Sequence, residues 1–174
     1  MTTGSCVLVT GLVILTLATA AGARDRAAPT PPKVVGPQEV EVIAVAMDPR
    51  TQAPAVLLEG KRDKRHFSMA IGMAEATGIA VPLQGVTPPR PLTHDLFLTL
   101  FGRLNVQLTR VVITDLRDDI YYATLQLTAA GTTFTLDARP SDAIALAIRA
   151  KVPVLVEDRV FDKSERPGAP GPRI

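Results

Sequence analysis

The segment that most constrains the fold is DAIALAIRA, at residues 142–150, which is apolar almost all the way round a helix. Such a helix has no polar face for water, so other elements must cover it on most sides. Ser141 stands just before the segment and is predicted to cap the helix. The helix over residues 141–150 is therefore expected to be buried and to pack against the sheet.

Most of the remaining segments carry strand patterns. Alternating, β-branched runs such as EVEVIAVAM predict strands, whereas apolar residues at helical spacing predict helices. Meander strands followed by helices favour a single α+β domain, with a strongly curved mixed or antiparallel sheet that could close like a barrel and about three packed helices. Strands are predicted over 39–47, 55–59, 66–71, 107–115, 120–127, 132–138 and 152–157, and helices over 72–83, 93–104 and 141–150.

The ends of the chain differ from this central domain. Residues 1–23 contain an uncharged apolar run that ends in Ala21-Gly22-Ala23, a pattern typical of a cleaved signal peptide. Residues 24–36 are proline-rich and predict a stiff linker. The folded domain is expected over 37–163, and 164–174 is expected to be a loose tail. The protein is therefore predicted to be exported, periplasmic or secreted, or membrane-anchored if the segment is not cleaved.

Composition limits the chemistry that the chain can support. The only cysteine is Cys6, so a disulfide within the chain and zinc sites built on paired cysteines are excluded. Aromatic residues make up 4% of the chain, which argues against binding of single strands by base stacking. The net charge is +2 and no basic stripe is visible, so a strong general attraction for nucleic acid is not expected.

Two helix starts share a polar pattern. Arg90-Pro91 precedes Thr93, His94 and Asp95, and Arg139-Pro140 precedes Ser141 and Asp142. The free N–H groups of a helix start suit phosphate, and Arg139 could add a bidentate contact. Thr93 and Ser141 are also ordinary N-caps, and Asp in a first turn is common, so a purely structural role stays open.

Carboxylates are numerous enough for a divalent-metal site. Such sites often hold Mg²⁺ or Mn²⁺ and assist phosphodiester hydrolysis. His94 could be a general base, a metal ligand or a hydrogen-bonding residue at the helix start. Asp118 and Asp119 are interpreted as turn formers instead. The available carboxylates are Glu75, Asp95, Asp115, Asp137 and Asp142.

Three blocks resemble the bifunctional nuclease domain family: PPRPLTHDL at 88–96, RVVITDLRDDIYYATL at 110–125 and DARPSDAIALAIRAKVPVLVED at 137–158. The resemblance covers nearly the whole domain, about residues 39–160. It implies metal-assisted hydrolysis of DNA and RNA phosphodiester bonds, with Mg²⁺ or Mn²⁺ as the cofactor. It also implies self-association, as a dimer.

The resemblance carries the following residue roles as expectations. The catalytic positions would be His94, Asp95, Asp115, Asp137 and Asp142. The substrate-binding positions would be Arg90, Thr93, Arg139 and Ser141, and the metal ligands Glu75, Asp115 and Asp142.

One stretch departs from the family pattern. In GMAEATGIAVPLQG, at 72–85, Thr77 and Gln84 occupy acidic positions of the family. Gly78 weakens the expected helix, and Pro82 is expected to end it early. The alternative to a nuclease is therefore a non-catalytic, oligomeric binding module that keeps the fold.

Overall fold

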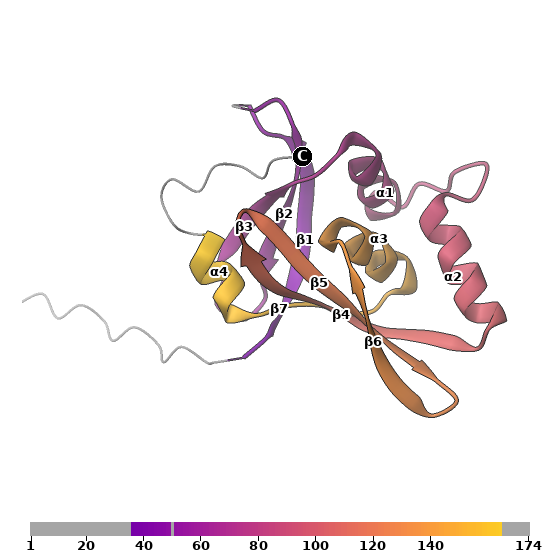
Figure 1. The fold of residues 1–174 in the computed structure, drawn as a ribbon. Coiled ribbons are helices and arrows are strands. Elements are labelled where there is room, and N and C mark those ends of the chain that lie inside the picture. Colours follow the sequence, from indigo (N-terminus) through magenta and orange to yellow (C-terminus); the bar gives the residue numbers. More distant parts are fainter. Residues whose placement is uncertain (1–35, 50, 165–174) are drawn as a thin grey trace, which may run out of the picture. The chain divides into compact units, whose positions relative to one another are not determined.

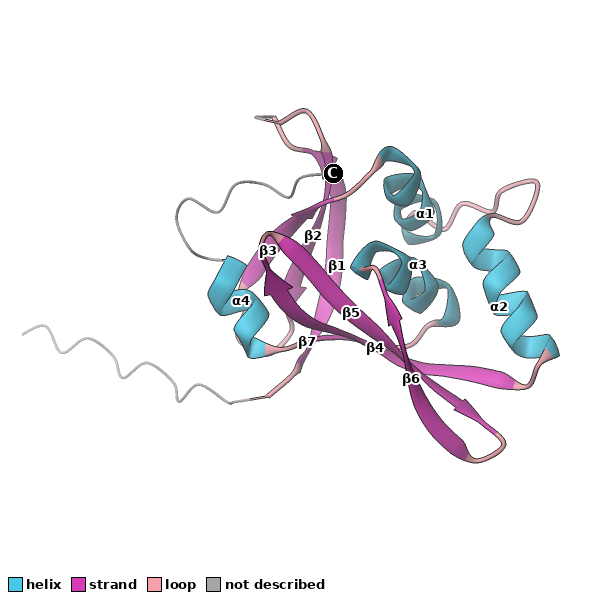
Figure 2. Ribbon diagram, in the orientation of Figure 1, coloured by secondary structure: helices cyan, strands magenta, loops and turns pink. Residues whose placement is uncertain are grey.

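The strand segments assemble into one mixed sheet in the computed structural model, which describes residues 36–49 and 51–164 (Figures 1 and 2). The seven strands follow the order β3-β2-β1-β7-β4-β5-β6, so β3 and β6 are the two edges of an open sheet. The α+β class is confirmed, and closure into a barrel is not observed in the described residues. The strands are β1 (Gln38–Met47), β2 (Pro54–Gly60), β3 (His66–Ala70), β4 (Val106–Arg117), β5 (Ile120–Ala129), β6 (Thr132–Ala138) and β7 (Val154–Val156), and the helices are α1 (Met73–Leu83), α2 (Thr93–Arg103), α3 (Pro140–Ala150) and α4 (Asp158–Ser164).

Tight turns connect the long hairpins of the sheet. Asp118 and Asp119 join β4 to β5 with φ values of 49° and 63°. Two successive positive φ values match the twist of a hairpin, and Asp tolerates them better than most residues. The interpretation of this pair as turn formers is therefore confirmed. Ala130 and Gly131, with φ values of 48° and 77°, join β5 to β6 in the same way.

Strand β7 makes the sheet mixed. It pairs antiparallel with β1 and parallel with β4, and it follows α3 in the chain. The register shifts once between β1 and β2, at Val42/Ala44, and twice between β4 and β5. Bulges of this kind bend a strand and increase its twist, which accounts for the curvature of the sheet.

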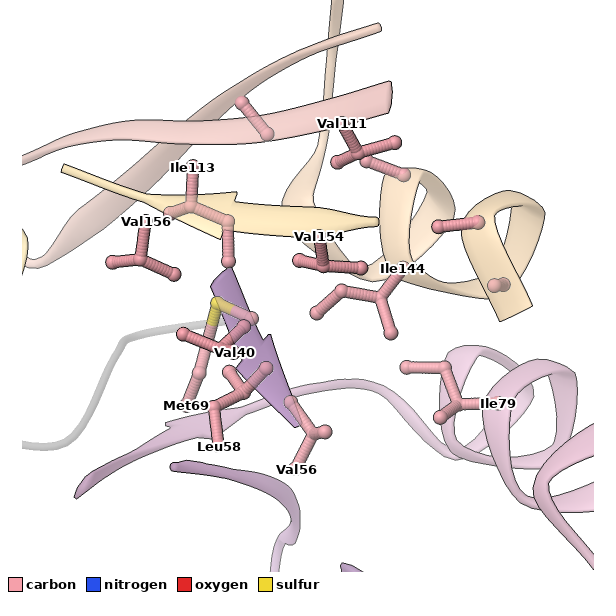
Figure 3. Packing of buried hydrophobic residues seen from close by; sticks show 14 of the residues in the cluster. Val40, Val56, Leu58, Met69, Ile79, Val111, Ile113, Ile144, Val154 and Val156 are labelled. Atoms are coloured by element: carbon pink, nitrogen blue, oxygen red, sulfur yellow. The ribbon is translucent and has the colours of Figure 1, made fainter. Parts of the chain in front are cut away.

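Helix α3 lies in the core, as its apolar sequence predicts. Figure 3 shows Ile144 near Val154 of β7 and Ile79 of α1. Burying one such side chain stabilises a fold by about 1.5–3 kcal/mol. The fully buried residues of α3 are Ala143, Ile144, Ala145 and Ala147, which point in several directions around the helix.

Helix α1 does not end before Pro82, as the sequence suggested, but continues to Leu83 with the proline inside it. Pro82 lacks the N–H that would reach the carbonyl of Gly78 one turn earlier. The guanidinium of Arg149 donates to that carbonyl instead, at 2.6 Å. The missing backbone hydrogen bond is therefore replaced by a side chain from α3.

Helix α2 has an unusual orientation. Leu98 and Phe101 pack against the core, but no residue of α2 is fully buried. Most of its apolar side chains face away from the core, with exposed fractions from 46% to 62%. These exposed residues, with Leu104 just after the helix, are Leu96, Phe97, Leu100 and Leu104.

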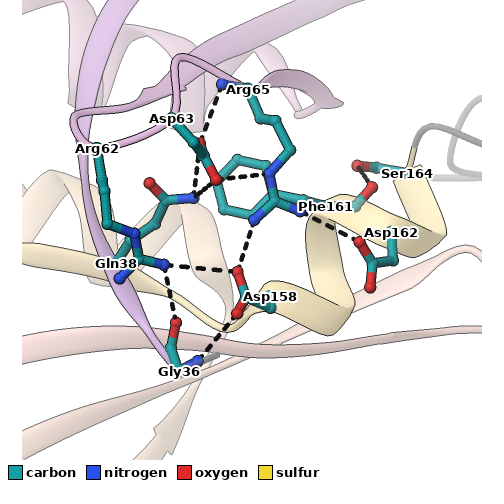
Figure 4. Close-up of polar contacts among 9 residues, drawn as sticks. All are labelled: Gly36, Gln38, Arg62, Asp63, Arg65, Asp158, Phe161, Asp162 and Ser164. Carbon is teal, nitrogen blue, oxygen red and sulfur yellow. Dashed lines mark hydrogen bonds and ion pairs between the residues drawn. The ribbon is translucent and has the colours of Figure 1, made fainter. Parts of the chain in front are cut away.

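The short helix α4 was not predicted, because seven residues with one apolar pair carry little periodicity. Arg65, in the β2–β3 hairpin, connects α4 to that hairpin through ion pairs (Figure 4). Its guanidinium bonds Asp158 at 2.6 Å and Asp63 at 2.7 Å and lies over the ring of Phe161. Asp158 also accepts the backbone N–H of Gly36, so this contact links α4 to the beginning of the described chain.

The predictions for residues 1–35 and 165–174, including the export segment and most of the linker, fall outside the described residues. Within the described ranges, no helix is long and apolar enough to cross a membrane.

Candidate active site

Arg139 joins the beginnings of two helices. Its Nε and Nη2 donate to the two carboxylate oxygens of Asp142, at 2.8 and 3.2 Å, and its Nη1 donates to Oε1 of Glu75 at 2.8 Å. Glu75 lies in the first turn of α1 and Asp142 in the first turn of α3. A guanidinium has five N–H donors, so two remain after these three bonds.

His94 completes this group from the first turn of α2. Its Nε2 lies 3.2 Å from Oδ1 of Asp142. Burial alone would raise the pKa of Asp142, but the hydrogen bonds from Arg139 and His94 outweigh burial and leave that pKa below its ordinary value. Glu75, His94, Arg139 and Asp142 are called the arginine cluster below.

The ring of His94 packs against the backbone of α1 at Gly78, which has no side chain. A Cβ added at Gly78 would lie 2.9 Å from Cε1 and 3.2 Å from Nδ1 of His94. Any larger residue would therefore push the ring away. The glycine that weakens α1 on propensity grounds gives His94 its place beside the helix.

Asp95 belongs to a neighbouring, more structural group. Its carboxylate accepts the N–H of Leu92 at 2.7 Å and Nε of Arg149 at 2.7 Å. Burial alone would raise the pKa of Asp95, but these hydrogen bonds outweigh it and hold the pKa below its usual value. Arg149 is almost completely buried and also donates to Gly78. Asp95 thus helps to hold the three helices together.

The two capping predictions were wrong. The N-cap residues are Arg139 and Leu92, whereas Ser141 and Thr93 already lie inside the helices. Pro140 takes the first helical position of α3, where a missing N–H costs nothing, and this places Ser141 one residue further in.

Asp115 lies in a different environment. Its carboxylate accepts Nζ of Lys163 at 2.6 Å and pairs with Arg117 at 3.0 Å. The hydrogen bond from Lys163, the strongest influence, lowers the pKa of Asp115. Lys163 belongs to α4, and none of these partners belongs to the arginine cluster. Its metal-binding role stays a prediction.

The other predicted residues range from exposed to buried. Asp137 is exposed on the edge strand β6, and Arg90 is exposed in the connector before α2. Thr93 lines an open cleft of about 390 Å³ together with His94 and Asp142, and this is called the polar cleft. Ser141 lines a second cleft of about 320 Å³. Arg139 and Glu75 line both clefts.

The carboxylates fit a divalent ion only in part. Among residues 36–49 and 51–164, no group of three or more His, Cys, Asp or Glu side chains is placed to hold a metal. Glu75 and Asp142 nevertheless both form ion pairs with Arg139, so this group contains two negative charges and one positive charge. Mg²⁺ commonly binds through one or two carboxylates, with water and substrate phosphate as further ligands. These two residues fit that mode, whereas Asp115 is held elsewhere.

The sequence matches the bifunctional nuclease domain over residues 56–167. The chain belongs to the bifunctional nuclease domain family. This domain contributes every residue of the arginine cluster, and the cluster joins the blocks around 75, 94 and 139–142 that lie far apart in the sequence.

The named relatives differ in their sequence identity to this chain and in the share of each protein that the match covers. An uncharacterized protein of Mycobacterium tuberculosis is 39% identical over 123 residues, which are 71% of this chain and 73% of that protein. Bifunctional nuclease 1 of Oryza sativa subsp. indica is 36% identical over 81 residues, covering 45% of this chain and 24% of the plant protein. Bifunctional nuclease 2 of Arabidopsis thaliana is 26% identical over 108 residues, covering 52% and 33%. The match with this chain therefore spans only part of these plant proteins.

The sequence did not indicate that Arg149 bonds Asp95 and the Gly78 carbonyl. It indicated Gly78 only as a residue that weakens α1, and not as one that makes room for His94. Arg149 lies in the last turn of α3, where a basic residue normally interacts with the helix dipole, so no local signal separates it from such a residue. Pro82 was the available clue, because a proline inside a helix leaves a carbonyl that needs another donor.

Proposed function

We propose that this chain hydrolyses phosphodiester bonds in DNA and RNA, and that the arginine cluster is its active site. The observation that carries the proposal is the convergence of an arginine, a histidine and two carboxylates beside an open cleft. Membership of the bifunctional nuclease domain family supports the choice of substrate.

Each residue has a role that follows from its contacts. The two remaining N–H groups of Arg139 contact phosphate oxygens of the scissile bond. His94 exchanges the proton, and Asp142 orients its ring through Nε2. Water attacks phosphorus and gives its proton to His94, one P–O bond breaks, and the proton passes to the leaving oxygen. Glu75 positions Arg139 through their ion pair.

Charge explains why a divalent ion belongs in the proposal. With a neutral His94, the cluster carries a net single negative charge, which repels phosphate. Mg²⁺ or Mn²⁺ held by Glu75 and Asp142 would reverse this charge and stabilise developing charge on phosphate oxygens. Activity is therefore expected to require the ion.

The test is a nuclease assay with the full chain on single-stranded DNA and RNA, with Mg²⁺, Mn²⁺ or a chelator. Asp142→Asn should lower the rate at least about 100-fold, in the range that acid–base and electrostatic groups contribute. Asp118→Asn is the matched control, because it removes a carboxylate from a turn that Asn tolerates. Equal rates for both variants would show that the cluster is not the active site.

The second candidate function is that of a non-catalytic, self-associating module. The exposed apolar side chains of α2 and Leu104 favour it, because monomeric proteins rarely leave large contiguous apolar surfaces open. A second copy of the chain is the proposed partner. Leu100→Glu should convert a dimer to a monomer in light scattering, whereas Ile43→Glu, an exposed control on β1, should not. A wild-type chain that is monomeric at all concentrations would remove this candidate.

A further inference from the structure

The second cleft beside the arginine cluster has a different chemistry. Apolar side chains from β3, β5 and the segment before α1 line most of it, and it is called the apolar cleft. Its volume, about 320 Å³, lies within the range of about 300–1,000 Å³ that small-molecule sites occupy. The apolar lining residues include Met69, Ile71, Ile120 and Tyr121.

Tyr121 forms a rigid part of this lining. Its ring stacks on Phe67, with ring centres 5.7 Å apart and planes 19° from parallel. Burial, and secondarily Asp119, raises the pKa of Tyr121 to about 12, so the phenol stays neutral. Tyr121 therefore contributes an uncharged, largely preformed surface to the cleft.

The polar groups of the apolar cleft lie close to the proposed phosphate position. Arg139 and Glu75 line both clefts, so their ion pair stands between them. A phosphate bound to the remaining N–H groups of Arg139 would place its attached group in one cleft or the other. Asp119 and Glu75 add carboxylate oxygens, which accept hydrogen bonds and repel a second phosphate.

We propose that the apolar cleft is a base-binding subsite for the nucleotide whose phosphate contacts Arg139, with a preference for bases that carry an exocyclic amino group. The apolar residues contact the base faces, and carboxylates accept from base amino groups, as they do from cytosine. The identity of the ligand as a nucleotide rests on the proposed function, but its binding can be measured without cleavage.

The test uses the full chain and three ligands that cannot be cleaved between nucleotides. Adenosine 5′-monophosphate, inosine 5′-monophosphate and ribose 5-phosphate are titrated in the presence of Mg²⁺, and binding is followed by isothermal calorimetry and amide chemical shifts. Adenosine monophosphate should bind at least about fivefold more tightly than ribose 5-phosphate, and its shifts should include the amides of Tyr121 and Ser141. Adenosine should also be preferred over inosine, which has a carbonyl in place of the amino group.

Two variants separate the parts of this proposal. Ile120 is 56% exposed, so Ile120→Asp should fold normally and lose the advantage of adenosine monophosphate over ribose 5-phosphate. Ile43→Asp, at a similarly exposed position on β1 outside the cleft, is the control. Asp119→Asn keeps a residue that tolerates positive φ and should reduce the preference for adenosine over inosine.

The outcomes distinguish this subsite from the nuclease proposal. Base-dependent binding that Ile120→Asp removes supports the subsite even if no polynucleotide is cleaved. Cleavage of DNA or RNA combined with equal binding of adenosine monophosphate and ribose 5-phosphate overturns the subsite and leaves the nuclease function standing. Base-dependent binding that Ile120→Asp leaves intact, with shifts away from Tyr121 and Ser141, also overturns it.

Discussion

Replacing Gly78 by alanine separates the helix propensity of α1 from the position of His94. Alanine is about 1 kcal/mol more favourable than glycine inside a helix. The added Cβ, however, would lie 2.9 Å from Cε1 of His94, whereas carbon atoms pack best at about 3.5–4.0 Å. The ring must therefore move by roughly 0.6–1 Å or turn about its side-chain bonds.

This movement has a larger effect on function than on stability. Overpacking costs typically about 1–3 kcal/mol, and the gain in propensity offsets part of it. We expect Gly78→Ala to change the free energy of unfolding by at most about 2 kcal/mol. The contact between His94 Nε2 and Asp142 is already long, at 3.2 Å, so a displaced ring loses it and the cleavage rate falls at least about tenfold.

Gly102 in α2 supplies the matched control, because a Cβ there meets nothing within 4 Å. Gly102→Ala should stabilise the protein by up to about 1 kcal/mol in urea unfolding and leave cleavage unchanged. The ring resonances of His94 should shift in Gly78→Ala and remain in place in Gly102→Ala. Equal stabilisation by both substitutions, with unchanged His94 resonances and rates, would refute the role assigned to Gly78.

Other predictions test the surrounding contacts. Arg149→Met should cost about 2–4 kcal/mol in urea unfolding, because it leaves Asp95 and the Gly78 carbonyl without their buried donor; a cost below about 1 kcal/mol would contradict this. The pKa of Asp95 is lower in the folded protein than in the unfolded chain, where it is about 3.9. The ionised carboxylate therefore stabilises the fold fully above the unfolded pKa, and this stabilisation is lost as the pH falls through the folded pKa. The melting temperature should therefore drop below about pH 4, less steeply in Asp95→Asn. Asp115→Asn should leave the metal-dependent cleavage rate unchanged within about twofold, because Lys163 holds this carboxylate. N-terminal sequencing of the mature protein should begin near Arg24 if the export prediction holds, and an intact Met1 in the membrane fraction would contradict cleavage.

Local patterns predicted the parts of the fold that depend on local chemistry. The sequence around Asp118 and Asp119 indicates a turn because short acidic residues tolerate positive φ, and the apolar residues of α3 indicate burial on most sides. Both expectations are confirmed. The sheet order and the parallel pairing of β7 with β4 depend on how distant segments meet, and no local pattern specifies them.

The same distinction applies to the candidate site. His94, Arg139 and Asp142 could be selected from helix starts, but only the tertiary structure shows that they share hydrogen bonds. Asp115 was selected only as a carboxylate at the end of a predicted strand, and it pairs with Lys163 from α4. The helix that brings Lys163 was too short to predict, so the separation of Asp115 from the cluster could not be foreseen.

Helix α3 carries Arg139 and Asp142 at its start and Arg149 in its last turn, and the residues between them are packed on nearly every side. Eleven residues at 1.5 Å each make a rod about 16 Å long, whose two ends cannot tilt independently. The backbone positions of Arg139, Asp142 and Arg149 relative to one another are thus set when the core folds, rather than when a ligand arrives. Substitutions in the middle of α3, such as Ile144→Val, should consequently change ligand affinity and melting temperature together. Substitutions at the exposed beginning of β6, far along the strand from Arg139, should change neither.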